Sequence, residues 1–115
     1  MKNSFELVHI GINQDSPEDA QKLADLLSEL FNLEPRHGKK SEFAGTLFEC
    51  MRSPFLGENG HIAMATADLE LAVAELKEKG FTFNMDTAAY DDSNKLKNIY
   101  LNGEFGGFAI HIMQQ

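Results

Sequence analysis

The hydrophobic residues of this chain recur in some segments at every second position, as in strands, and in others at every third or fourth position, as in helices. The order of these segments in the first half of the chain is repeated in the second half. Alternation with a period of two over residues 5–12 predicts a strand, because successive strand side chains point to opposite faces. Ser16 is a typical N-cap, and apolar residues at three- and four-residue spacing then predict a helix over residues 17–32. Shorter strand patterns follow at 33–40 and 42–52, the first interrupted by proline and glycine and therefore expected at a sheet edge.

The second half repeats this order after a loop rich in turn formers at residues 53–60. We expect a strand at 60–65, a helix at 68–79 and strands at 81–84, 98–101 and 108–113. The chain therefore reads as a single domain, residues 1–115, built from two βαβββ units of about residues 1–55 and 56–115. The predicted class is α+β, with a cupped, mostly antiparallel sheet and the helices on its outer face.

Four of the predicted strands each carry one polar side chain that can bind a metal. They are His9, Glu49, His61 and His111. In every case the bulky apolar residues share one face of the strand and the polar group lies on the other, among small neighbours such as Gly11. The bulky faces are expected to pack under the helices, and the four polar groups to line the concave side of the sheet.

Imidazole and carboxylate are common ligands of first-row divalent metals, so convergence of these four side chains would make a metal site. The pattern suits Zn, Ni, Mn or Fe without choosing among them. Each histidine taken alone is better explained as a hydrogen-bonded core residue, and Glu49 without the histidines as a solvated strand carboxylate; a metal site is indicated only by the four together. His37 lies in a polar, turn-like stretch and is expected at the surface.

Composition and charge exclude several classes of partner. The formal net charge is -8, and no cluster of Lys and Arg alternates with aromatic residues, which excludes a nucleic-acid ligand because such binding rests on cationic side chains. No apolar run approaches the roughly 20 residues that span a bilayer, and no signal peptide is recognisable, so we expect no membrane partner and a cytoplasmic protein. Cys50, the single cysteine, is expected to be a buried hydrophobe.

The stretch Gly60-His61-Ile62-Ala63-Met64, with candidate ligands on the first and last strands of each unit, resembles the vicinal oxygen chelate superfamily. This superfamily includes glyoxalase I, bleomycin- and fosfomycin-resistance proteins and extradiol dioxygenases, and the resemblance covers nearly the whole chain. It implies a metal-dependent lyase, isomerase or dioxygenase acting on a small oxygen-rich substrate, a carbonyl or a diol. It also implies a homodimer, in which the loop at 53–60 could act as a hinge for exchanging halves.

A closer resemblance is carried by residues 43–45, 53–63 and 106–111, which look like a small domain found alone or fused behind bacterial 2-keto-3-deoxy-6-phosphogluconate aldolases. The aldolase barrel is absent from this sequence, so aldolase chemistry is not expected. His111 also departs from the glyoxalase pattern, because it stands where glyoxalase I enzymes usually carry a second glutamate as catalytic base.

The resemblance and the strand parity together suggest roles for individual residues. His9, His61, His111 and Glu49 would bind the metal, Glu49 could also act as catalytic base, and Tyr100 and Asn98 could hydrogen-bond a substrate. The alternative is a non-catalytic binding module of the same fold, which holds a metabolite or drug and is linked to sugar-acid metabolism.

Overall fold

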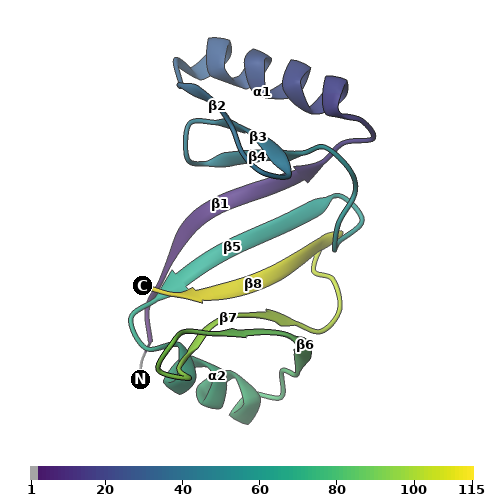
Figure 1. Ribbon diagram of the computed structural model, residues 1–115. Coiled ribbons are helices and arrows are strands. Elements are labelled where there is room, and N and C mark those ends of the chain that lie inside the picture. Colours follow the sequence, from purple (N-terminus) through teal and green to yellow (C-terminus); the bar gives the residue numbers. More distant parts are fainter. Residues whose placement is uncertain (1–2) are drawn as a thin grey trace.

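A computed structural model describes residues 3–115, which form one eight-stranded sheet and two helices (Figure 1). In chain order the elements are β1 (Phe5–Asn13), α1 (Pro17–Phe31), β2 (Pro35–His37), β3 (Ser41–Ala44), β4 (Phe48–Met51), β5 (Gly60–Thr66), α2 (Leu69–Glu78), β6 (Phe83–Tyr90), β7 (Leu96–Leu101) and β8 (Phe108–Gln114). The sheet order is β2-β3-β4-β1-β5-β8-β7-β6. The α+β class and the two βαβββ units are confirmed.

The two units meet through their first strands. β1 and β5 pair antiparallel at the centre of the sheet, while β1 pairs in parallel with β4 and β5 in parallel with β8. The other neighbouring pairs are antiparallel, so the sheet is mostly antiparallel as predicted. This topology places the first and last strands of both units side by side in the order β4-β1-β5-β8.

Local sequence signals set the first helix. The Ser16 side chain accepts a hydrogen bond from a backbone N–H of the first turn, and Asn32 ends the helix in the left-handed conformation. Ala20 and Ala24 are buried on the face that packs against Cys50 of β4. Burial raises the pKa of Cys50 to about 11, so its thiol stays protonated at neutral pH, as its strand position suggested.

The second helix begins after the N-cap Asp68 and covers the other end of the sheet. Its buried residues Leu69 and Val73 pack against Ile99 of β7 and Ile112 of β8. Across residues 3–115, no helix combines the length and the apolar composition that crossing a membrane requires.

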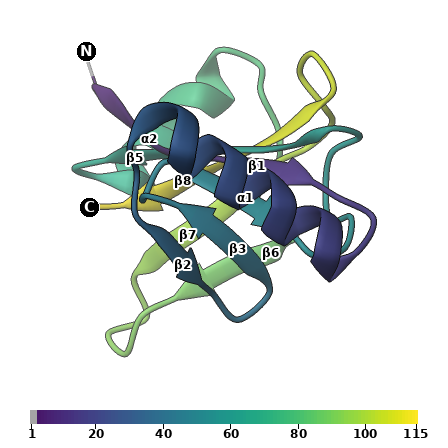
Figure 2. The ribbon, with the colours of Figure 1, turned by 90° about the horizontal axis from the view of Figure 1, so that it is seen from above.

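The helices lie at opposite ends of the sheet (Figure 1), and in the view from above α1 lies in front of the strands (Figure 2). α1 packs on β2, β3 and β4, whereas α2 packs on β5, β7 and β8. The outer-face residues of the two central strands are therefore only half-buried; they are Val8, Ile10, Ile12, Ile62 and Met64. The prediction that every bulky face packs under a helix holds at Cys50 and Ile112 but not at these positions, because each helix crosses over its own unit.

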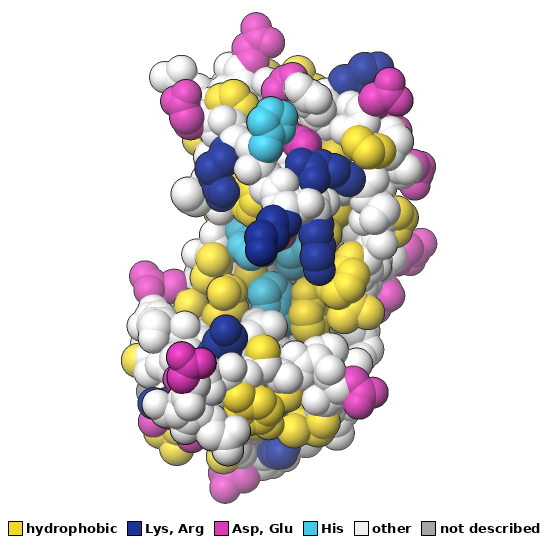
Figure 3. All heavy atoms as spheres, viewed as in Figure 1, with side chains coloured by type: hydrophobic (Ala, Val, Ile, Leu, Met, Phe, Trp, Pro, Cys, Tyr) yellow, Lys and Arg dark blue, Asp and Glu magenta, His cyan; other side chains and the backbone are white. Residues whose placement is uncertain are grey.

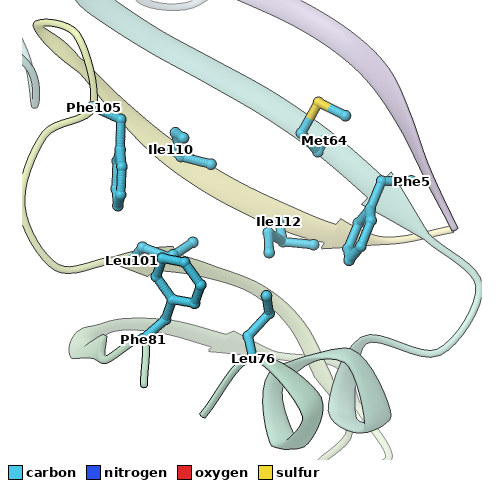
Figure 4. A pocket seen from close by; sticks show the side chains of 8 residues that line it. All are labelled: Phe5, Met64, Leu76, Phe81, Leu101, Phe105, Ile110 and Ile112. Atoms are coloured by element: carbon cyan, nitrogen blue, oxygen red, sulfur yellow. The ribbon is translucent and has the colours of Figure 1, made fainter. Parts of the chain in front are cut away.

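Beside α2 this apolar surface forms a groove of about 330 Å³, seen from close by in Figure 4. Its walls are entirely hydrophobic, consisting of Phe5, Met64, Leu76, Phe81, Leu101, Phe105, Ile110 and Ile112. The groove opens on the face of β8 opposite His111, because Ile110 and Ile112 flank that residue along the strand. The homodimer that the sequence resemblance implies stays a prediction.

β6 differs from its predicted extent, because it runs over Phe83–Tyr90 and not over residues 81–84. Its pairing with β7 shifts register between Asn84 and Ala89. Within this irregular stretch the Thr87 hydroxyl donates to the backbone carbonyl of Asn84 at 2.6 Å and accepts from the backbone N–H of Tyr100 at 2.9 Å. A side chain thus replaces part of the backbone ladder, a substitution that hydrophobic alternation does not reveal.

The packing of α2 can be tested with two leucines of the same helix. Leu69 is fully buried and Leu71 is 54% exposed. Leu69→Ala should lower the free energy of unfolding by about 3 kcal/mol because it leaves a cavity in the core. Leu71→Ala should change it by less than about 0.5 kcal/mol. Urea denaturation followed by circular dichroism measures both, and equal losses would contradict the placement of the core.

Candidate metal centre

The four candidate ligands lie on the four adjacent strands at the centre of the sheet and point to the same face. Backbone pairing arranges them in two rows: Glu49, Gly11 and His61 are successive partners across β4, β1 and β5. In the next row His9, Ala63 and His111 are partners across β1, β5 and β8. A small residue therefore separates the two ligands of each row. Figure 3 shows histidine side chains at the bottom of a hollow on this face.

Three of the ligand atoms form a nearly equilateral triangle. His9 Nε2 and His61 Nε2 are 3.2 Å apart, and Glu49 Oε1 lies 3.2 Å from the first and 3.1 Å from the second. His111 completes the group, because one ring nitrogen of each of the three histidines lies within 4.8 Å of those of the other two. The structure thus brings together all four residues that the sequence singled out.

Hydrogen bonds alone cannot account for all three close contacts of this triangle. A carboxylate carries no proton, and each imidazole carries at most one at Nε2, so one of the three close pairs always lacks a bridging proton. Two donor atoms that each bind one ion at about 2.0–2.1 Å lie about 2.9–3.4 Å apart at ordinary coordination angles. The three observed separations fall in that range, so the donor set fits a divalent transition metal.

His111 is held in the neutral tautomer that metal binding requires. Its Nδ1 donates a hydrogen bond of 2.6 Å to Asn98 Oδ1, which leaves the Nε2 lone pair free. Burial, with the neighbouring His61 and His9, lowers the pKa of His111 to about 4. The side-chain oxygen of Asn98 thus orients His111. The expected contact of Asn98 with a substrate stays a prediction.

Tyr100, the other expected substrate contact, stacks on the ring of His111 with centroids 4.6 Å apart. It is 8% exposed, and its ring also meets the edge of Phe55 at 6.2 Å. Burial and the charge of Glu49 raise the pKa of Tyr100 to about 12, so the phenol is protonated at neutral pH. It can donate a hydrogen bond but is not an available base.

Glu49 is fixed as an anion. Burial alone would raise the pKa of its carboxyl, but hydrogen bonds with His61, His9 and Ser41 outweigh that effect and hold the pKa well below its usual range. The Ser41 hydroxyl donates to Glu49 Oε2 at 2.7 Å and is fully buried. Sequence reasoning missed Ser41, because its contact depends on how β3 pairs with β4 and no motif marks it.

Gly11 makes room for the ring of His61. A Cβ atom at position 11 would lie 2.0 Å from His61 Cε1 and 2.2 Å from its Nδ1, which no real structure tolerates. His61 Nδ1 is buried and has no hydrogen-bond partner in the described chain. Its ring is therefore positioned by packing against Gly11 and by the contacts of Nε2.

A cavity of about 190 Å³ lies over the four ligands. Besides them it is lined by Lys40, Met51, Phe55 and Tyr100. This volume is below the about 300–1,000 Å³ of sites that enclose drug-sized molecules, so the cavity suits a smaller ligand.

His37 and Arg52 lie outside this cluster. The His37 side chain is 74% exposed, as expected for a surface residue, and contacts the carboxylate of Glu42. Arg52 donates two hydrogen bonds to Glu42 Oε2, at 2.8 Å from Nε and 2.6 Å from Nη2. Burial would raise the pKa of Glu42, but the hydrogen bonds of Arg52 and His37 lower it, so this buried carboxylate is ionised and paired.

Comparison with solved structures identifies the same fold in proteins of low sequence identity. A hypothetical protein, BH1468, from Bacillus halodurans C-125 superposes with a TM-score of 0.62 at 18% identity, over 97% of this chain and 95% of that chain. A methylmalonyl-CoA epimerase in complex with methylmalonyl-CoA and NH4+ gives 0.59 at 14%, over 97% and 96%. The Streptomyces coelicolor methylmalonyl-CoA epimerase in complex with 2-nitronate-propionyl-CoA gives 0.58 at 12%, over 96% and 94%.

These likenesses support the glyoxalase-like fold that the sequence suggested. No protein-family profile matches the chain, and no curated protein does so either. The resemblance to the small domain fused to aldolases stays a prediction.

The contact between Gly11 and His61 can be tested with a double-mutant cycle in the presence of a chelator. Gly11→Ala should lower the free energy of unfolding by about 2 kcal/mol, because the new methyl group displaces the imidazole. In a His61→Ala background the same change should cost much less, since the obstructing ring is gone. Urea denaturation measures both. An equal cost in the two backgrounds would mean that Gly11 serves the backbone and not His61.

Proposed function

We propose that this protein binds a divalent transition metal through His9, His61, His111 and Glu49, and acts on a small oxygen-rich substrate, a carbonyl compound or a diol. The observation that carries this proposal is the triangle of His9 Nε2, His61 Nε2 and Glu49 Oε1, with edges of 3.1–3.2 Å. The donor set of imidazoles and carboxylate suits Zn, Ni, Mn or Fe. The likeness in fold to methylmalonyl-CoA epimerases supports a glyoxalase-like role.

Neighbouring residues of the chain hold the ligand side chains in position for a metal ion. Asn98 orients His111, Ser41 orients Glu49, and Gly11 leaves space for His61. Such supporting contacts reduce the reorganisation that binding requires, and they set the tautomer and direction of each ligand. A bound divalent ion would supply Lewis acidity, polarising a carbonyl or chelating adjacent oxygens of a substrate.

The chain's own residues would hold the substrate in the cavity above the ligands. Phe55 and Met51 provide apolar walls that limit access of water, and the protonated phenol of Tyr100 can donate a hydrogen bond to a substrate oxygen. Glu49 contributes negative charge at the ligand cluster. Its lowered pKa makes it a weak proton acceptor, which favours a role as ligand over the role of catalytic base.

The lowered pKa of Glu49 also gives weight to a second candidate, a non-catalytic binding module. Proton abstraction near neutral pH needs a base with a pKa near that value, and Glu49, Tyr100 and His111 are all shifted away from it. Incubation of the metal-loaded protein with the methylglyoxal–glutathione adduct and with catechols, followed by nuclear magnetic resonance, separates the two. Products that depend on metal and protein favour the enzyme, whereas tight binding without products favours the module.

Removal of any one ligand tests the metal centre. His9→Ala, His61→Ala, His111→Ala and Glu49→Gln should each weaken the affinity for Zn²⁺ or Co²⁺ by more than about 100-fold, because loss of a supporting contact alone costs about 10–100-fold. Elemental analysis and cobalt titration by visible absorption measure the effect. His37→Ala is the matched control, since this fourth histidine contacts Glu42 and should leave metal binding unchanged. Full retention of metal in all four ligand variants would refute the centre.

Asn98 offers a separate test of the supporting contacts. Asn98→Ala should weaken metal affinity by about 10–100-fold, because His111 loses the acceptor that fixes its tautomer. Asn102→Ala removes an exposed amide on the same segment, which bonds Thr82, and should have no effect. If Asn98→Ala left metal affinity intact but weakened substrate binding, the original assignment of Asn98 as a substrate contact would be correct.

A further inference from the structure

The cavity over the ligand cluster has one cationic side chain in its wall, Lys40. This residue lies in the loop between β2 and β3, and its Nζ is 5.8 Å from the centre of the Phe55 ring. Within residues 3–115 no carboxylate oxygen lies within 4.0 Å of this ammonium group. Lys40 therefore lines the site without an ion-pair partner among the described residues.

The backbone that carries Lys40 is fixed by Arg52. Its guanidinium donates to the carbonyls of Gly38 and Lys39, each at 2.9 Å, and its backbone N–H donates to the carbonyl of Lys40 at 3.1 Å. The charge of Arg52 is neutralised by the buried Glu42. Arg52 is thus a positioning residue for the loop, and of these two residues Lys40 is the one whose charge is available to a ligand in the cavity. An anchored backbone lowers the entropy cost of using that side chain.

The charges around the cavity select for an anion. Glu49 is the single carboxylate in the wall, and it cannot balance both a divalent ion and Lys40. The cavity is therefore positive once a metal is bound, although the chain as a whole has a net charge of -8. In Figure 3, Lys and Arg side chains gather beside the histidines, while most Asp and Glu lie towards the edges. A positive cleft of this kind concentrates anionic ligands.

We propose that Lys40 binds the carboxylate of the substrate while other oxygens of the same molecule reach the metal. The substrate class would be small carboxylic acids with a second chelating group a few atoms away, a size that the cavity of about 190 Å³ admits. A carboxylate matches the single charge of Lys40, whereas a phosphate dianion would call for a second cation, and among the described residues no other Lys or Arg lines the cavity. The guanidinium of Arg52 is already engaged with Glu42. This inference rests on the proposed metal centre.

The test uses two hydroxamates of the same shape, butyrohydroxamate and succinic monohydroxamate. They chelate a metal through the same group and differ in that a terminal methyl is replaced by a carboxylate. Each is titrated into the full chain loaded with Co²⁺, and the visible spectrum of the ion reports binding. We expect the carboxylated probe to bind about tenfold tighter, the size of one charged hydrogen bond in a partly open site, with the advantage shrinking as salt is added.

Two exposed neighbouring lysines supply the variant and its control. Lys40→Gln should remove the preference for succinic monohydroxamate, and Lys39→Gln should keep it, because Lys39 does not line the cavity. Equal affinity of both probes for the wild type, or an unchanged preference in Lys40→Gln, would overturn the role of Lys40 while the cobalt spectrum shows the metal centre intact. Absence of a cobalt spectrum in the wild type would overturn the metal centre, and this inference with it.

Discussion

The parallel pairing of the first and last strands within each unit is the constraint on which the rest of the structure depends. With the antiparallel pairing of β1 and β5 it places β4, β1, β5 and β8 side by side, and the period-two geometry of strands then directs one polar side chain from each to the same face. Gly11 and Ala63 separate the ligands within the two rows, so the imidazoles and the carboxylate approach within contact distance without a bulky neighbour. A shift of one residue in any of these pairings would move a ligand to the other face.

This arrangement has an energetic cost that the surrounding contacts offset in part. A carboxylate and three imidazoles at the centre of a sheet lose hydration, and His61 Nδ1 is left without a partner in the described chain. Hydrogen bonds from Ser41 to Glu49 and from His111 to Asn98 recover some of that loss. Polar groups that are prepared for a ligand and incompletely satisfied without one are typical of functional sites.

The face of the sheet opposite the ligands is covered by the two helices only in part. Each helix packs on strands of its own unit, so the hydrophobic core is divided into a cluster under α1 and a cluster under α2. The central strands keep an apolar outer surface, while their inner surface holds the polar cluster. The segment after β2 links the parts of the site, because Lys40 lines the cavity and the adjacent Ser41 donates a hydrogen bond to Glu49.

The sequence by itself determined the repeated order of elements, the N-cap of the first helix and the strand positions of His9, Glu49, His61 and His111, because alternation and capping are local properties. Only the tertiary structure decided the register that joins those positions, the contacts of Asn98 and Ser41, and the uncovered centre of the outer face. The irregular pairing of β6 through Thr87 belongs to the same group. These features depend on residues distant in the chain, so no local pattern encodes them, and they had to be read from the assembled sheet.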